Sequence, residues 1–207
     1  SHVRGGAVDV DLYFSRSFSP AYGDDADEAA RKFPCKITCI TIDAPTASQF
    51  TIPTQARSQR DVFKKLDKKN RYEQKMEGVL LAGFGMFAYL AHVHIAAGAN
   101  LVCTVLMKSL ANMVEAGRPL GSSLRVHVDN TTAENKNGTV IGMCAWLVQA
   151  GIFEDVTIFF MPVGHTFNAL DQSFRPLIQR ICDSTIATVD DVVEVIKDGL
   201  REHGADG

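Results

Sequence analysis

Short hydrophobic runs, separated by Gly, Pro and Asp, divide this chain into predicted strands and helices. Runs rich in β-branched and aromatic residues predict strands, and apolar residues spaced three or four apart predict helices. The predicted strands are Lys36–Ile42, Lys75–Ala82, Met86–Ile95, Ser123–Val128 and Val156–Met161. The predicted helices are Leu101–Ala116, Thr139–Ala150, Asn168–Cys182 and Val189–His203.

The order of these elements is βββαβαβα with one further helix. Hairpin links predict an antiparallel first half, and the later alternation predicts parallel strands joined by crossover helices. With 207 residues, we expect one α/β domain over 1–207: a helix-flanked mixed sheet with its core at 36–182, an insertion at 44–74 and a C-terminal helix at 189–203. Ribonuclease H-like folds have this order, and other mixed α/β folds can accommodate it.

One long stretch, Val79–Met107, contains no Asp, Glu, Lys or Arg. A charge-free run of this length is a possible sign of a membrane helix. Gly83, Gly85 and Gly98 interrupt it, however, and the first two fit a tight hairpin between strands. We therefore predict two strands and a helix, and no membrane partner.

Three acidic residues follow predicted strands. Asp43 ends the first strand, Asp129 ends the fourth, and Asp171 lies near the start of the helix after the fifth. Strand ends beside parallel crossovers form clefts, and clustered carboxylates repel one another unless a cation neutralises them. Carboxylates suit Mg²⁺ or Mn²⁺, and two such ions can drive phosphodiester chemistry. Taken singly, each acid also fits a turn or a helix start.

The segment Leu124–Ile181 contains Asp129-Asn130, then the box Glu134-Asn135-Lys136-Asn137, then Gly164-His165-Thr166. In these motifs the chain resembles an uncharacterised eukaryotic domain family associated with transposon-like genes. The resemblance covers about residues 36–182 and implies a ribonuclease H-like transposase core with an Asp43, Asp129, Asp171 triad. It also implies nuclear localisation. Phe167, Asn168 and Ala169 stand where that family usually has His and two acids.

The polar residues around the triad have two interpretations each. The amides of Asn130, Asn135 and Asn137, with Lys136, could contact a phosphate backbone, whereas a solvated turn in which Asn137-Gly138 starts the helix is the alternative. His165 could neighbour the metal or carry a proton, or it could be a buried histidine bonded to the backbone.

Charge is distributed unevenly, although the net charge is only −3. Residues 56–75 hold eight Lys or Arg against three acids, which fits phosphate contacts or a solvated face. The last helix is acidic, so we expect it to face away from nucleic acid and to meet a protein partner or a flanking domain. The candidate phosphate contacts are Arg57, Arg60, Lys64, Lys65, Lys68 and Lys69.

Five unpatterned cysteines favour free thiols in an intracellular protein. The chain begins at Ser1 without a leader, so we expect native flanking regions. Two hypotheses follow. The first is a transposase-derived polynucleotidyl transferase or nuclease that uses Mg²⁺ or Mn²⁺ and acts on nucleic acid, DNA in preference to RNA. The second is a non-catalytic ribonuclease H-like module that binds nucleic acid or protein.

Overall fold

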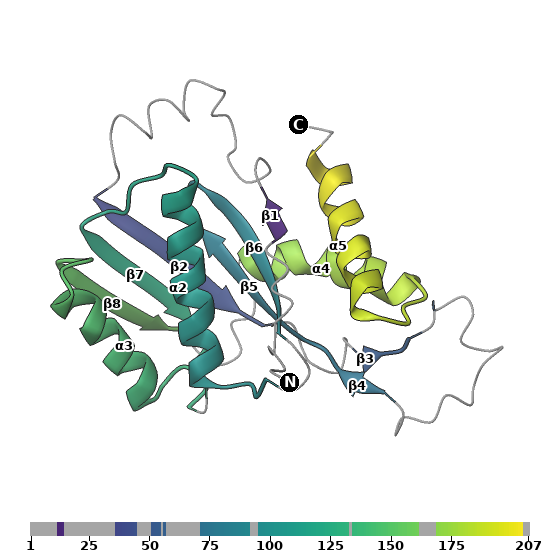
Figure 1. The fold of residues 1–207 in the computed structure, drawn as a ribbon, viewed down its shortest axis with the longest axis horizontal. Helices are drawn as coiled ribbons and strands as arrows, with labels where there is room; N and C mark the ends of the chain where they lie inside the picture. The colour runs from purple at the N-terminus through teal and green to yellow at the C-terminus, as the bar shows by residue number, and fades with distance from the viewer. Residues whose placement is uncertain are drawn as a thin grey trace, which may run out of the picture.

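The computed structural model contains a mixed sheet with helices on both faces (Figure 1). It describes residues 12–14, 36–44, 51–54, 56, 71–91, 95–132, 134–161 and 169–204. The strands are β1 (Leu12–Phe14), β2 (Ile37–Asp43), β3 (Thr51–Ile52), β4 (Tyr72–Glu73), β5 (Lys75–Leu81), β6 (Gly85–Ala91), β7 (Ser123–Val128) and β8 (Asp155–Phe160). The helices are α2 (Ala99–Glu115), α3 (Gly138–Gln149), α4 (Ala169–Asp183) and α5 (Val189–Gly204).

The main sheet has the strand order β1-β6-β5-β2-β7-β8. β2 joins its two halves, because it pairs antiparallel with β5 on one side and parallel with β7 on the other. β5 and β6 form an antiparallel hairpin, and β8 runs parallel to β7. β3 and β4 form a separate two-stranded sheet. The expected mixed sheet, half antiparallel and half parallel, is therefore confirmed.

One face of the sheet packs against α2 and α3. Side chains alternate across a strand, and in β7 the apolar members Leu124, Val126 and Val128 are buried while the residues between them are partly exposed. The same core contains Ile40 and Ile42 of β2 and one side of α2. This alternation places the side chains of Ser123, Arg125 and His127 on the opposite face.

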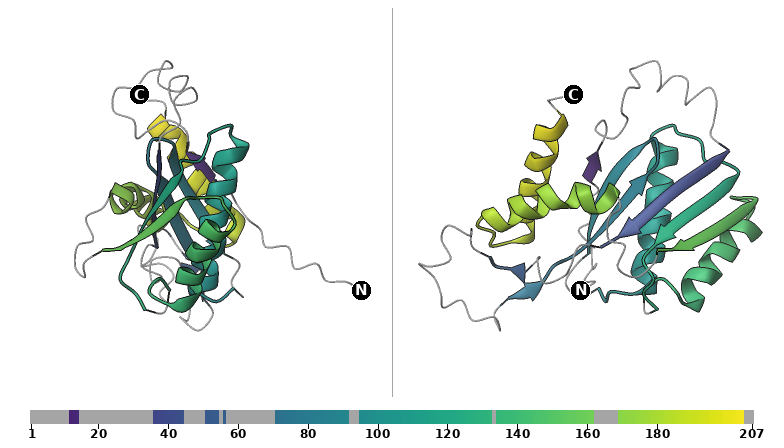
Figure 2. Two further views of the ribbon diagram at one scale, coloured as in Figure 1. Left: turned by 90° about the vertical axis from the view of Figure 1, so that its left-hand side faces the viewer. Right: turned by 180° about the vertical axis from the view of Figure 1, so that it is seen from behind.

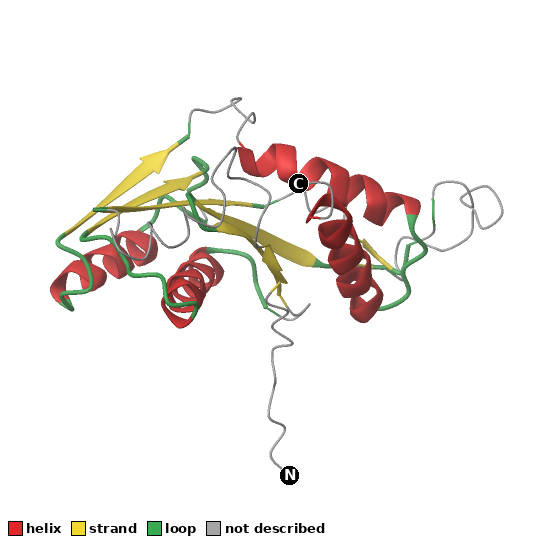
Figure 3. Ribbon diagram, turned by 90° about the horizontal axis from the view of Figure 1, so that it is seen from above, coloured by secondary structure: helices red, strands yellow, loops and turns green. Residues whose placement is uncertain are grey.

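The opposite face carries α4 and α5, as the view from above shows (Figure 3). Their apolar side chains, among them Phe174 and Ile196, form a second core with residues of β5 and β6. Gly78 lets this layer approach closely, since a Cβ at Gly78 would lie 1.9 Å from the Cζ of Phe174. Seen from behind, the layer covers the β5–β6 side and leaves β7 and β8 without a helix in front of them (Figure 2).

Local sequence explains where the helices begin and end. The side chain of Asn137 caps α3 by accepting hydrogen bonds from the backbone nitrogens of Thr139 and Val140. Gly117 and Gly151, just beyond α2 and α3, have positive φ angles of 76° and 72°, which favour glycine. Asn137 therefore starts the helix, as the alternative interpretation of the box predicts.

The predicted boundaries agree with the main strands and helices to within a few residues, whereas β1, β3 and β4 were not predicted. Residues 44–74 were expected to be a connector, but β3 and β4 lie within that range. The apolar side of α5 is also already occupied, because Val192, Val193 and Ile196 pack in the second core. Within the described part of the chain, no helix is both long and apolar enough to cross a membrane.

Candidate functional site

Two of the three predicted acids lie side by side at one end of the sheet. Asp43 is the last residue of β2, and Asp129 directly follows β7. These strands are parallel neighbours, with Thr41 opposite His127. Two residues further along the same register, Asp43 comes opposite Asp129, on strands about 4.8 Å apart. The structure therefore brings Asp43 and Asp129 together, as the sequence predicts.

The carboxylate of Asp129 is held by the loop that follows it. Its Oδ1 accepts hydrogen bonds from the backbone nitrogen of Thr131 at 3.3 Å, from Thr131 Oγ1 at 2.7 Å and from the side-chain amide of Asn135. Its other oxygen, Oδ2, takes part in none of these bonds. The loop fixes the orientation of the carboxyl group through one oxygen only, which leaves the second available to a ligand.

A third acid at this end, Glu77, was missed by the sequence analysis. Glu77 precedes Gly78, the β5 residue that pairs with Asp43, and its side chain is only 8% exposed. Burial, followed in order by the charges of Glu134, Asp43 and Asp129, raises the pKa of Glu77 from 4.5 to about 8. Near neutral pH this carboxyl group therefore holds a proton.

The effect of Glu134, Asp43 and Asp129 on one buried carboxyl group shows that four acids gather at the same end of the sheet. The sequence does contain a signal for Glu77, because it is an acid inside the otherwise apolar run Met76–Leu81. An acid at such a position is either paired or part of a site.

The residues of the Glu134–Asn137 box, between β7 and α3, have different structural roles. Asn135 is 5% exposed, and its amide nitrogen donates to Asp129 and to Thr131, so it is not positioned as a surface contact for phosphate. Its carbonyl oxygen, Oδ1, is buried and has no hydrogen-bond partner. Asn137 caps α3, and the ammonium of Lys136 lies 5.6 Å from the centre of the Phe160 ring. Asn130 is exposed.

The third predicted acid, Asp171, lies in the first turn of α4. Its side chain is outside the described residues. The backbone position is close to the site, because Phe174 comes one turn later in α4 and lies against Gly78, the partner of Asp43. His165 is outside the described residues, and so are the six predicted phosphate contacts Arg57, Arg60, Lys64, Lys65, Lys68 and Lys69.

The chemistry of this end suits a hard cation. The carboxylates and the free amide oxygen of Asn135 are oxygen donors, the type that Mg²⁺ and Mn²⁺ prefer. Among the side chains that the structure describes, no three His, Cys, Asp or Glu groups are arranged closely enough to hold one ion. A complete ligand set would therefore need a donor beyond them, and α4, which carries Asp171, packs against Gly78, the β5 partner of Asp43.

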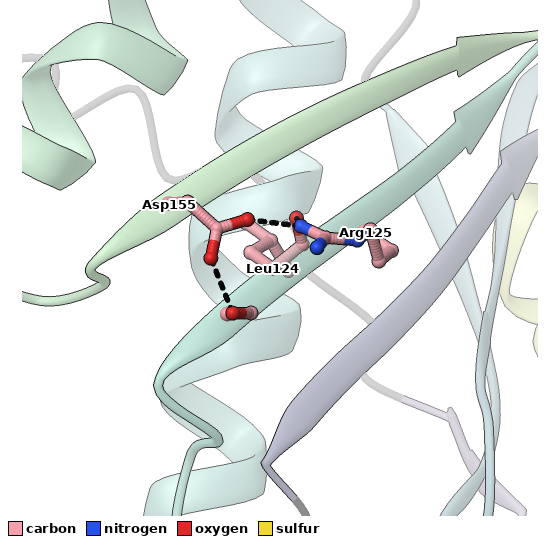
Figure 4. Close-up of polar contacts among 4 residues, drawn as sticks. Leu124, Arg125 and Asp155 are labelled. Atoms are coloured by element: carbon pink, nitrogen blue, oxygen red, sulfur yellow. Dashed lines mark hydrogen bonds and ion pairs between the residues drawn. The ribbon is translucent and has the colours of Figure 1, made fainter.

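The opposite end of β7 has a different polar cluster. Asp155, at the start of β8, accepts hydrogen bonds from Ser123 and from Arg125, with which it forms an ion pair (Figure 4). The bonds from Ser123 and then from Arg125 lower the pKa of the Asp155 carboxyl group. Along the same face of β7, His127 stacks on Phe159 with ring centres 4.8 Å apart. These contacts join β7 to β8.

The model of one protein family, described as a domain of unknown function (DUF7869), matches residues 64–205. The match covers more than half of the chain and includes Glu77, Asp129 and the box, but not Asp43. No curated protein and no solved structure matches the sequence.

Proposed function

We propose that this chain, which belongs to the DUF7869 family of domains of unknown function, is a metal-dependent nuclease or polynucleotidyl transferase core of the ribonuclease H-like type, derived from a transposase. The observation that carries the proposal is that Asp43 and Asp129 come together at the carboxyl ends of the adjacent parallel strands β2 and β7, with Glu77 and Glu134 near enough for the charges to interact. Four acids together destabilise the fold unless a cation or a proton offsets their repulsion.

The order and direction of the strands support the proposed fold type. The main sheet takes β1, β2, β5 and β6 from the chain before α2. β2 lies between its antiparallel partner β5 and its parallel partner β7, and α3 then crosses from β7 to β8. In such a sheet, the carboxyl ends of the parallel strands are where ligands bind. Asp43 and Asp129 occupy that end.

The residues fit a divalent cation. Asp43 and Asp129 would hold it, with Asp171 supplying a further carboxylate from α4 and the buried amide oxygen of Asn135 as a neutral donor. A bound Mg²⁺ or Mn²⁺, or a pair of them, would supply a nucleophilic water and stabilise the leaving oxygen of a phosphodiester.

Other residues of the site would orient the metal-binding carboxylates and limit the negative charge around them. Thr131 and Asn135 hold Asp129 in one orientation through Oδ1. Because the buried Glu77 holds a proton, it adds no negative charge to this end of the sheet, where the carboxylates would repel a phosphate backbone. The basic residues of 56–75 would contact phosphates outside the site.

The non-catalytic ribonuclease H-like module remains the second candidate. It is favoured by Asn168 and Ala169, which stand at two positions where the resembling family usually has acids. Under this alternative the domain binds nucleic acid or protein and hydrolyses nothing.

A thermal-shift experiment with Mn²⁺ separates the metal site from an ordinary acidic surface. Binding to the folded state at about 100 times the dissociation constant stabilises by about 2.7 kcal/mol, which raises the melting temperature of a domain of this size by about 5–10 °C. Asp129→Asn should abolish the rise, and Asp190→Asn, on the exposed side of α5, should leave it intact. An equal rise in all three proteins would contradict the proposal.

Cleavage of single-stranded and duplex DNA and RNA with Mn²⁺ then distinguishes the two candidates. The enzyme should cut a substrate that the Asp129→Asn variant leaves intact. Metal binding without cleavage would favour the non-catalytic module.

A further inference from the structure

One side of the molecule is formed by the edge strand β8 and the helix α3 beside it (Figure 1). In the described part of the chain, β8 is the last strand of the sheet and pairs with β7 alone. Its other edge therefore offers backbone donors and acceptors to a further strand.

This edge has none of the usual features that prevent pairing. Charged residues, Pro and bulges normally protect an edge strand, but 156–160 reads Val-Thr-Ile-Phe-Phe. The one charged residue of β8 is Asp155, at its start, and it already binds Arg125 and Ser123. Among the described residues, nothing but β7 pairs with the middle of this strand, and its side chains suit another apolar strand.

The helix beside this edge is apolar on its exposed side. α3 contains no charged residue. Val140, Cys144 and Leu147 are buried against the sheet, and the residue after each is rotated by about 100° around the helix. These residues are Ile141, Ala145 and Val148; Ile141 is 53% exposed and Val148 38%.

This flank of α3 points beyond the sheet. In a right-handed β7–α3–β8 crossover, a rotation of about 100° from the sheet turns the side chains away from α2 and toward the free edge of β8. An apolar helix flank and an unpaired strand edge thus border the same side of the molecule.

We propose that this side is a homodimer interface in which β8 pairs antiparallel with β8 of a second copy and the two α3 helices pack against each other. A two-fold axis perpendicular to the sheet relates the copies, so each presents the same surface to the other. Residues opposite each other in an antiparallel pair point to the same face, so the axis lies at one residue of β8, either Thr157 or Ile158. Val156, Ile158 and Phe160, which are apolar, then stay on the α3 side of the sheet in both copies.

Charge favours the antiparallel orientation of the two copies. In an antiparallel pair the two Asp155 residues lie at opposite ends of the joined strands. A parallel pair in register would place these like charges side by side, which is destabilising.

The size of the surface also suits a dimer. β8 is about 20 Å long and α3 about 18 Å at the usual rise per residue, and the layers are about 10 Å apart. Such a side is small, at the lower end of the size range for specific interfaces, which fits a weak dimer.

Sedimentation velocity over a range of concentrations tests the proposal. The parent chain should form a dimer by about 100 μM, the weak range that a small interface allows. Ile141→Glu with Val148→Glu should weaken the dimer more than about tenfold, because two carboxylates would be buried from each copy. Val114→Glu on α2, at a residue that is also 53% exposed, should leave it unchanged.

Amide hydrogen exchange tests whether β8 is the strand that pairs in the dimer. Exchange of the β8 amides should slow as the parent concentration rises, and should not do so in the double variant. A parent chain that stays monomeric, or a dimer in which β8 exchange is unaffected, would overturn the proposal. Binding of only a different protein to this side would also overturn it.

Discussion

Two carboxyl groups near opposite ends of β7 have pKa values that are shifted in opposite directions. At its start, Asp155 of the neighbouring strand is bonded by Ser123 and Arg125, and its pKa is lowered. Beyond its end, the charges of Asp43 and Asp129 act on Glu77, whose pKa is raised to about 8, mainly by burial. The first arrangement stabilises the folded chain, whereas the second opposes folding near neutral pH, as expected of a site kept for a ligand.

Substitution of Glu77 should produce the largest effect, and this effect should be on how the stability of the fold depends on pH. The folded-state pKa of Glu77 is raised from 4.5 to about 8, so the folded chain keeps a proton that the unfolded chain loses. Stability from this proton is fully present below pH 4.5 and is lost as the pH rises to about 8, by about 3–5 kcal/mol. Glu77→Gln, neutral at every pH, should remove this loss.

Urea unfolding between pH 4.5 and 8.5 measures this slope. Glu115→Gln, at an exposed acid of α2, is the control and should keep it. The same slope in the Glu77→Gln variant would mean that the acidic end does not hold a strained carboxyl group.

Gly78 tests whether α4 must lie close to the acidic end. In Gly78→Ala the new Cβ would lie 1.9 Å from Phe174, so α4 should shift, at a cost of about 1–3 kcal/mol. Metal binding should weaken as well, since α4 carries Asp171. Gly142→Ala, where a Cβ meets nothing within 4 Å, should be neutral or stabilise by up to about 1 kcal/mol. Thermal unfolding with and without Mn²⁺ checks both variants, and equal behaviour would contradict the close packing of α4.

Asn135 and Asn137 allow a sharper test within the same loop. Asn137→Ala should cost about 1 kcal/mol, because it removes the cap of α3, and should leave Mn²⁺ affinity unchanged. Asn135→Ala should reduce Mn²⁺ affinity, because Asp129 loses the bond that orients it. Calorimetric titration with Mn²⁺ compares them, and an equal loss of affinity in both would mean that the loop acts only through its fold.

Substitution of Asp155 should produce the smallest change in stability. The carboxylate of Asp155 is on the surface, where ion pairs contribute little. Because its pKa is lowered from 3.8, its contribution is present at neutral pH and is lost as the pH falls below that value. Asp155→Asn should therefore flatten the acid limb of the stability curve and change it little at pH 7, as measured by thermal unfolding. A large loss at pH 7 would show that this end is more than a surface contact.

Much of the fold could be predicted from the sequence because its signals are local. The alternation in Ser123–Val128 and the cap at Asn137 depend only on neighbouring residues. β1, β3 and β4 have two or three residues each, too few for a hydrophobic pattern, and depend on their pairing partners.

The site could be predicted only in part. Asp43 and Asp129 mark strand ends, so the topology alone brings them together. Glu77 joins them through the pairing of β5 with β2, and Asn135 turns inward to bond Asp129. The first arrangement depends on which strands pair and the second on the conformation of a loop. Neither can be predicted from the spacing of residues along the chain.

Anomalous diffraction from a crystal soaked in Mn²⁺ tests the central claim, that Asp43 and Asp129 form a metal site, most directly. We expect a peak at the carboxyl ends of β2 and β7, about 2 Å from a carboxylate oxygen of each residue, and no such peak in Asp129→Asn crystals. A parent crystal with no peak at this end, or with manganese only elsewhere on the surface, would contradict it.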